Sequence, residues 1–483
     1  MLKNSESFLT ATISIDGEDA ALNSCNVFFP SIKDNKIEVE ITSGDKRITN
    51  LSIDEFRISG SKSNATFNSS CQLSIINGCI IFSESKPNEL LGDLENKVRL
   101  VPKETYIMKK IANDNSNIAI VEFYVNKAPI ITPHTSTIQN PLGSLIKNNL
   151  TELHLNIGDN INISSEVNYN FESDSENITM QPYLVITTEI EKKTEDLPKL
   201  INEEILPKVE DFLLISSFIQ RDKITCKGWE ASYNGVQTSY YRTYMSHADD
   251  IKKKGDVLID TPYVSDFLNI TVKKLQESKF KDAIKIAINA LNNSNSFTFE
   301  LSFILMFQAV ESLVNTYKRE MNLEFILPNK NFKTLSKKIK DSMKSQEFKK
   351  LLNDGDYESI IKKIPELNRL SLNDAFRLME KEYSLSFHGL WPLFNDGETC
   401  GLVKIRNVFA HGGSFPRQTY AALMTARTCL QFFLERFIFQ LLGWPIEKTY
   451  ISDDYLSKYY FSENQILNSQ RVLLDHLSNK TNK

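Results

Sequence analysis

The residues of this sequence that are best suited to chemistry lie in the segment 405–413, which reads IRNVFAHGG. Arg406 and His411 stand close together in a mostly apolar stretch, and two glycines follow the histidine directly. At 3.6 residues per turn, Asn407 and His411 stack one turn apart, whereas Arg406 is rotated from His411 by roughly 140° on an ideal helix. Because glycine readily ends a helix, we predict that His411 lies in the last turn and can swing toward Arg406.

An arginine and a histidine together supply what metal-free cleavage of RNA requires. The guanidinium of Arg406 can hold a phosphate through two parallel hydrogen bonds, and histidine is the side chain best suited to proton transfer near neutral pH. The nucleophile is the 2′-hydroxyl of the RNA itself. One histidine cannot easily act as base and as acid at opposite ends of the displaced phosphate, so a second copy of the motif would complete the site. The residues therefore predict a homodimer with a composite active site, and neither a metal nor another cofactor.

The spacing of Arg406 and His411 resembles the R-x4–6-H signature of HEPN domains, in the frequent form with a polar residue, here Asn407, after the arginine. The run QAVESL around Glu311 lies in an apolar segment and resembles the helix before the signature helix in that family. The arrangement as a whole resembles the ApeA type of abortive-infection protein, in which a C-terminal HEPN domain follows a β-rich N-terminal domain. The resemblance extends over most of the chain and is weaker before residue 261.

This resemblance implies an endoribonuclease that cuts cellular RNA during phage infection, with tRNA among the candidate substrates. Arg406 and His411 would form its catalytic pair, Asn407 would fill its common polar position, and Glu311 would orient Arg406. The N-terminal domain would restrain the nuclease until a trigger, for instance a phage-derived one, releases it. Many HEPN modules bind without cutting. A non-catalytic module that docks RNA or a protein partner therefore stays open as the alternative.

The elements that must position these residues change character along the chain. Up to about residue 188, runs rich in Ile and Val alternate partly with polar residues and are separated by turn-forming clusters, which predicts an antiparallel sandwich or barrel. A helical segment broken by Pro207 follows, and Asn234-Gly235 between aromatic runs predicts a hairpin, because both residues tolerate positive φ. Strands are expected at 37–42, 47–53, 72–82, 117–125 and 183–188, with a surface loop at 166–177.

Beyond about residue 261 apolar residues recur at spacings of three and four, which predicts an all-α bundle. The expected helices include a buried central one at 297–317, two at 371–383 and 398–411, and a long one at 416–442 closed by Gly443 and Pro445. The predicted fold class is thus α+β and multidomain. The domains are expected at 1–195 (a β-rich sensor or regulatory domain), 196–262 (a connector with helix and aromatic hairpin), 263–450 (the all-α HEPN domain) and 451–483 (a C-terminal tail).

Charge and composition limit the remaining alternatives. With 41% hydrophobic and 24% charged residues the chain has the composition of a soluble globular protein, and a net charge of −5 excludes a uniformly basic nucleic-acid binder. A local basic face is still compatible with that charge. Its candidate RNA contacts are Lys333, Lys337, Lys338 and Lys340, although a solvated helix face is the slightly favoured interpretation.

Other motifs point away from metals, nucleotides and membranes. The six cysteines are scattered without a CxxC pair, and no GxxxxGK[ST], GxGxxG or HExxH motif occurs. No apolar leader or long apolar run is present, so we expect a reduced, cytoplasmic protein that does not enter a membrane.

His388 stands among large apolar residues and is expected to be a satisfied structural residue. The aromatic residues of 229–244 can stack bases, but packing of a hairpin onto a core is the favoured interpretation.

Overall fold

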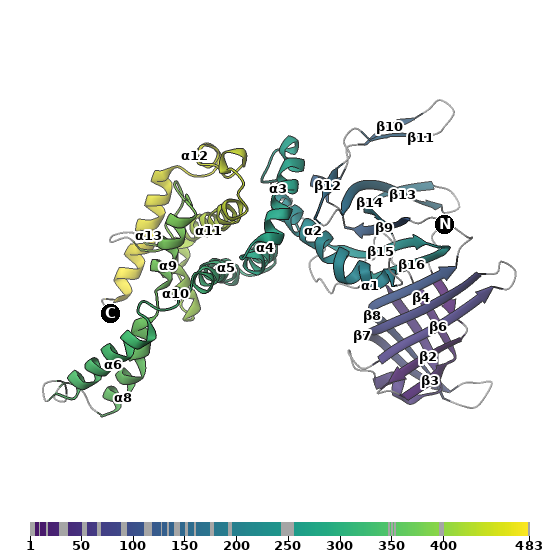
Figure 1. The fold of residues 1–483 in the computed structure, drawn as a ribbon, viewed down its shortest axis with the longest axis horizontal. Coiled ribbons are helices and arrows are strands. Elements are labelled where there is room, and N and C mark those ends of the chain that lie inside the picture. Colours follow the sequence, from purple (N-terminus) through teal and green to yellow (C-terminus); the bar gives the residue numbers. More distant parts are fainter. Residues whose placement is uncertain are drawn as a thin grey trace. The chain divides into compact units, whose positions relative to one another are not determined.

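The computed structural model divides the chain into two units. The first comprises residues 1–256 and 264–272, and the second comprises residues 257–263 and 273–483. Strands dominate the first unit and helices the second (Figure 1), in agreement with the predicted α+β class and the change of periodicity near residue 261. The structure describes residues 5–8, 10–15, 18–28, 37–50, 56–64, 69–87, 94–110, 118–126, 128–132, 135–139, 145–149, 153–158, 161–173, 178–191, 196–242, 256–345, 348, 351, 354–395 and 400–481.

In the first unit the strands pair in an antiparallel manner throughout the described residues, and most of them belong to one sheet. Its main path runs β12-β13-β14-β9-β15-β16-β8-β7-β6-β2-β3, and β5, β4 and β1 branch from β8. The strands of this sheet are β1 Ser5–Phe8, β2 Thr10–Ile15, β3 Glu18–Leu22, β4 Ser24–Phe28, β5 Glu38–Ser43, β6 Phe56–Asn64, β7 Ser69–Pro87, β8 Leu94–Lys110, β9 Ile118–Val125, β12 His154–Asn156, β13 Asn162–Ser173, β14 Ile178–Glu191, β15 Cys226–Tyr233 and β16 Val236–Arg242. A separate hairpin is formed by β10 Thr135–Gln139 and β11 Leu145–Asn149.

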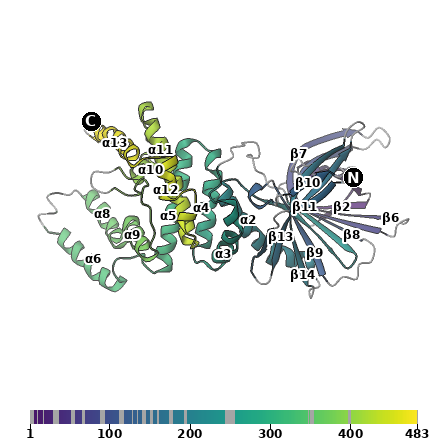
Figure 2. The same ribbon diagram turned by 90° about the horizontal axis from the view of Figure 1, so that it is seen from above.

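The core of the sheet follows from strict alternation along the strands. In β2, for example, Ala11, Ile13 and Ile15 are buried while the residues between them are exposed or half-buried. These side chains join buried residues of β4 to β8 in one apolar cluster. Seen from above in Figure 2, β6, β8, β9 and β14 splay like a fan, which is the cumulative twist expected of a large antiparallel sheet.

Helices α1 Leu197–Leu200 and α2 Leu206–Gln220 are joined by a π-helical turn at Ile201–Ile205. Pro207 stands in the first turn of α2, where its missing N–H is tolerated, so the proline interrupts the helical pattern without ending it. The turn carries Asn202, which accepts a hydrogen bond from Trp229 Nε1 at 2.7 Å and donates one to the Tyr106 hydroxyl at 2.9 Å. This helical segment is therefore attached to the sheet.

The hairpin predicted at Asn234-Gly235 is confirmed. Both residues have positive φ, 47° and 69°, and Tyr233 pairs with Val236. The hairpin is nevertheless not part of a connector at 196–262, because β15 pairs with β9 and β16 pairs with β8 inside the large sheet. The burial of Trp229 and Tyr240 agrees with the packing interpretation of this aromatic stretch, whose Tyr244 lies outside the described residues.

Two other local predictions were wrong. Residues 46–50 of the strand expected at 47–53 form a 3-10 helix, because Asp45 accepts hydrogen bonds from the backbone N–H and the guanidinium of Arg47. Residues 51–53 lie outside the described residues. The surface loop expected at 166–177 is strand as far as Ser173, where β13 pairs with β14 along its length. Tyr169 and Phe171 alternate with polar residues there, a pattern that composition alone hides.

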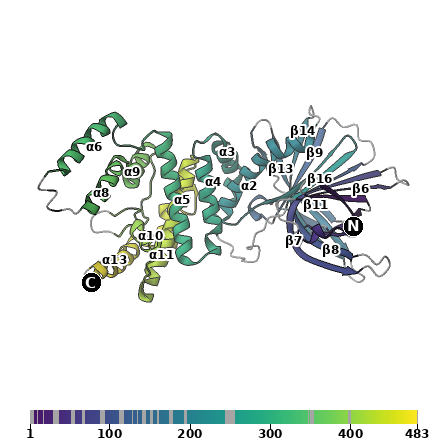
Figure 3. The ribbon, with the colours of Figure 1, turned by 90° about the horizontal axis from the view of Figure 1, so that it is seen from below.

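Helices occupy most of the described residues after 260, and four of them lie near the predicted places 297–317, 371–383, 398–411 and 416–442. The helices are α3 Val264–Glu277, α4 Lys281–Asn293, α5 Phe299–Glu320, α6 Asn329–Met343, α8 Asp354–Lys363, α9 Leu372–Glu382, α10 Leu402–Ala410, α11 Tyr420–Leu441, α12 Asp453–Tyr459 and α13 Glu463–Thr481. Helix α5 is central: it contacts α4, α9, α10 and α11, which surround it in Figure 3. Gly443, with φ of 71°, follows the end of α11 as predicted.

The residues expected to form a separate tail belong to the helical unit. Helix α13 packs on α11 and buries Ile466, Gln470 and Leu473, which recur at helical spacing. The boundary expected at residue 450 is therefore not a boundary. No helix among the described residues is long and apolar enough to cross a membrane.

Candidate functional site

Helix α10 presents Arg406, Asn407 and, just after its end, His411. Leu402, Ile405 and Phe409 are buried, and Phe409 makes edge-to-face contact with Phe303 of α5 at a centroid distance of 5.8 Å. These three positions define one apolar face of α10. An isolated helix of nine residues is not stable in water, so α10 depends on the packing of this face. The packing against α5 therefore decides where the polar residues of α10 point.

The C-terminal end of α10 is built by two glycines. Gly412 has a φ of 72°, a conformation that L side chains rarely adopt, and its N–H bonds to the Phe409 carbonyl at 3.0 Å. The N–H of Gly413 bonds to the Val408 carbonyl at 2.8 Å, which completes a Schellman motif. A Cβ at Gly413 would lie only 2.8 Å from Val408 Cγ1. The predicted end of the helix at His411 is thus confirmed, because α10 ends at Ala410.

The guanidinium of Arg406 is held by the neighbouring helix. Its Nη2 lies 2.7 Å and 3.0 Å from the two carboxylate oxygens of Glu311 on α5. One turn earlier on α5, the ring of Phe307 lies 5.7 Å from the guanidinium carbon. The side chains of Arg406 and Glu311 are 28% and 23% exposed, so the pair is partly withdrawn from water yet reachable from it. The predicted contact between Glu311 and Arg406 is therefore present.

Asn407 extends this network toward the helix end. Its side-chain oxygen accepts a hydrogen bond from Arg406 Nη1 at 3.1 Å, and the residue is exposed. The backbone N–H of His411 bonds to the Asn407 carbonyl at 3.1 Å, so the two residues stack one turn apart. Glu311, Arg406 and Asn407 form one hydrogen-bonded row that leads to His411.

The ring of His411 is exposed and makes no hydrogen bond or ring contact with any residue that the structure describes. Since His411 continues the last turn of α10, the rotation of roughly 140° that separates it from Arg406 on an ideal helix is retained. Within one chain the structure does not bring the imidazole into contact with the guanidinium. The swing of His411 toward Arg406 stays a prediction.

The four candidate RNA-binding lysines lie on α6. Lys333, Lys337 and Lys338 are exposed and Lys340 is half-buried. None of them contacts the Arg406 network within the described part of the chain. The arrangement agrees with the interpretation of a solvated helix face.

The expectation for His388 was wrong in part. Its side chain is 83% exposed, and its Nδ1 lies 3.4 Å from an Asp453 carboxylate oxygen. The buried group at this place is Arg436 of α11, only 1% exposed, which pairs with Asp453 at 2.7 Å and donates to the carbonyls of Ile451 and His388. The prediction for His388 failed because apolar neighbours in sequence do not fix the direction of a side chain in a non-helical segment. The burial of Arg436 was not predicted because a single arginine in an apolar helix does not indicate from sequence whether it is buried.

The described cysteine side chains offer no reactive thiol. Cys25, Cys226, Cys400 and Cys429 are free and buried. Burial raises the pKa of Cys25 and Cys429 to about 12 and that of Cys226 and Cys400 to about 11. These thiols therefore stay protonated near neutral pH. Within the described residues no three His, Cys, Asp or Glu side chains gather in a way that could hold a metal ion.

Comparisons of the chain with protein-family models, with curated proteins and with solved structures gave no match. The class of protein is defined here by fold and site. It is an α+β chain whose helical unit carries an ion-paired arginine, an exposed asparagine and an exposed histidine on one short helix.

Proposed function

We propose that the chain is a metal-independent endoribonuclease of the HEPN type, which cuts cellular RNA through the 2′-hydroxyl of the RNA and acts in antiphage abortive infection under the control of its N-terminal unit. The observation that carries the proposal is the Arg406 guanidinium, fixed by Glu311 and still 28% exposed, on the helix that ends at an exposed His411. An arginine held in this way loses little conformational freedom when it binds a phosphate.

Each residue has a defined part in this mechanism. Arg406 uses Nη2 for Glu311 and one N–H of Nη1 for Asn407, so its Nε–H is left to donate to one oxygen of the scissile phosphate while the guanidinium charge stabilises negative charge in the transition state. His411 transfers a proton to or from the reacting oxygens. Glu311 positions the guanidinium, and Asn407 sets the outer edge of the site.

A second copy of the chain completes the site in this proposal. The helix geometry keeps Arg406 and His411 of one chain roughly 140° apart in rotation, so a substrate held by one arginine needs a histidine that arrives from elsewhere. A two-fold dimer with α10 facing α10 supplies it and also provides a second proton-transfer group.

The same separation favours the second candidate function. A helical module in which Arg406 and His411 face different surroundings can dock RNA or a protein partner without cutting. For a binding module, His411→Ala should leave the affinity for RNA or the partner unchanged. For the nuclease, the same substitution should abolish cleavage.

Cleavage of total RNA and tRNA by the purified full-length chain tests the nuclease directly. We expect cleavage that persists in EDTA and leaves 2′,3′-cyclic phosphate ends, and losses of about 100-fold or more in both Arg406→Ala and His411→Ala. The matched controls are Arg417→Ala and His388→Ala, which remove an exposed residue of the same kind elsewhere on the unit and should cut like the parent. RNA that stays intact with every protein, or equal cleavage by parent and His411→Ala, would refute the nuclease.

A further inference from the structure

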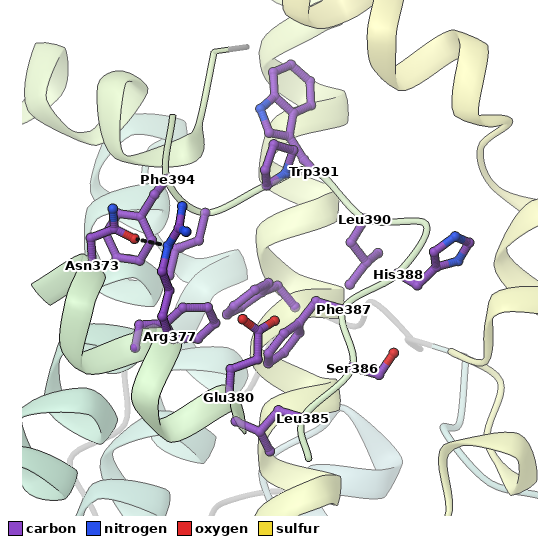
Figure 4. A pocket seen from close by; sticks show the side chains of 14 residues that line it. Asn373, Arg377, Glu380, Leu385, Ser386, Phe387, His388, Leu390, Trp391 and Phe394 are labelled. Carbon is purple, nitrogen blue, oxygen red and sulfur yellow. Dashed lines mark hydrogen bonds between the residues drawn. The ribbon is translucent and has the colours of Figure 1, made fainter. Parts of the chain in front are cut away.

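A pocket of about 520 Å³ lies in the helical unit between α9, α11 and the segment 385–394 (Figure 4). Its size falls in the range of small-molecule sites. Phe387 and Phe394, both half-buried, supply an aromatic wall, the buried ring of Phe376 packs against both, and Arg377 and Glu380 line the pocket from α9. The pocket thus combines flat apolar surface with one cation and one anion.

Glu380 is the polar group at the centre of this pocket. In Figure 4 its carboxylate points toward Phe387 and into the space between α9 and the 385–394 segment. Burial raises the pKa of Glu380, and Arg377 offsets this only in part. No described residue donates a hydrogen bond to the carboxylate. An ammonium group of a ligand would form an ion pair with the carboxylate and so compensate for the hydration that the carboxylate loses on burial.

Arg377 stands beside it and is exposed. Its Nε donates a hydrogen bond to Asn373 Oδ1 at 3.3 Å, which aims the guanidinium at the upper part of the pocket near Phe394 in Figure 4. Side chains three positions apart on a helix start about 5–6 Å from each other. The two ends of a dipeptide are separated by roughly 7 Å, so one short zwitterion can reach Arg377 and Glu380 together.

The pocket wall is bonded to the helix that carries Arg406. The carbonyls of Pro392 and Leu393 accept hydrogen bonds from the N–H groups of Leu402 and Val403, both at 3.0 Å, which satisfies two of the free donors in the first turn of α10. Gly401 lies so close to the Phe394 backbone that a Cβ there would be 2.4 Å from its carbonyl carbon. A ligand that contacts Phe394 therefore acts on a segment that cannot move independently of α10.

We propose that this pocket binds a short zwitterionic ligand with aromatic side chains, of dipeptide size, and that binding is transmitted to α10. The ammonium group pairs with Glu380, the carboxylate with Arg377, and the rings pack against Phe387 and Phe394. Binding and its effect on α10 do not depend on the proposed nuclease; only a change in RNA cleavage would rest on it.

Calorimetric titration of the full-length chain with the dipeptide Phe-Phe tests the site. We expect saturable binding, a loss of at least 10-fold in affinity for N-acetyl-Phe-Phe and for Phe-Phe amide, and no binding of Gly-Gly. Glu380→Gln should remove the preference for the free ammonium group, while the matched control Glu366→Gln, an exposed carboxylate outside the pocket, should keep it. Absence of saturation with Phe-Phe, or equal affinity for its acetylated form, would overturn the site.

Hydrogen exchange tests the transmission to α10 without any assay of cleavage. Phe-Phe should slow exchange in the peptide that contains Leu402 and Val403 as well as in 385–394. Protection confined to 385–394 would overturn the coupling.

Discussion

The ion pair between Glu311 and Arg406 should be measurable as an energetic coupling between α5 and α10. A double-mutant cycle of Glu311→Ala, Arg406→Ala and the double variant isolates that coupling from the other contacts of each side chain. Both carboxylate oxygens meet the same Nη2, at 2.7 Å and 3.0 Å, and Arg406 also lies over the Phe307 ring. The ring contact is lost both in Arg406→Ala and in the double variant, so it cancels in the cycle.

The magnitude follows from the exposure of the pair. Hydrogen bonds to charged groups contribute about 1.5–3 kcal/mol when well buried, whereas exposed ion pairs contribute about 0.2–1 kcal/mol. With side chains 28% and 23% exposed, the pair lies between these limits. We therefore expect a coupling energy of about 1–2 kcal/mol. The exposed contact between Arg319 and Glu320, 3.9 Å long, serves as the control cycle and should give about 0–0.5 kcal/mol.

Urea unfolding gives the four free energies if the probe reports on the helical unit alone. Trp391 and Trp444 lie in that unit, so Trp229→Phe is introduced as a common background in all four proteins and their fluorescence is followed. A coupling below about 0.3 kcal/mol would equal that of independent sites. In that case Glu311 does not hold the guanidinium in solution, and Arg406 is not positioned by that carboxylate.

Three further predictions concern stability, and thermal unfolding checks each of them. Gly412→Ala and Gly413→Ala should each cost about 1–2 kcal/mol, the first through its positive φ and the second through its contact with the preceding turn. Trp391→Phe removes the indole N–H that donates to the Cys400 carbonyl at 2.5 Å and should cost about 1–3 kcal/mol. Burial and two facing carboxylates raise the pKa of Glu122, so the folded state holds this proton more tightly than the unfolded chain, and the resulting stability is present at acidic pH and lost as pH rises through the folded pKa. Glu122→Gln should therefore raise Tm at pH 8 and leave it nearly unchanged at pH 4.

The features that sequence predicts well here are those with a local physical cause. The hairpin at Asn234-Gly235 and the end of α10 at Gly412 both depend on residues that accept positive φ, and both are found where expected. The apolar period of 297–317 likewise marks α5, because a central helix must be apolar over most of its surface.

Features that depend on residues far apart in sequence were missed, or were predicted only from the resemblance to a family. The insertion of β15 and β16 between β9 and β8 joins strands about a hundred residues apart in sequence, and no local pattern specifies that order. The contact of Glu311 with Arg406 was expected only from the resemblance to HEPN domains. The Glu380 pocket had no sequence signal, since its walls come from α9, α11 and a segment without regular structure.

The way α10 is attached bears on where the histidine of the proposed site comes from. Its first turn is bonded to Pro392 and Leu393, its middle is bonded to Glu311 through Arg406, and its end is set by Gly412 and the following glycine. These three attachments oppose a rotation of α10 about its axis, which would be one way to bring the imidazole next to the guanidinium of the same chain. In the proposed dimer, a second helix would deliver the histidine to the phosphate that Arg406 holds. On the proposed composite site, His411 acts on the substrate of another copy, so a chain that is monomeric under assay conditions should bind RNA without cutting it.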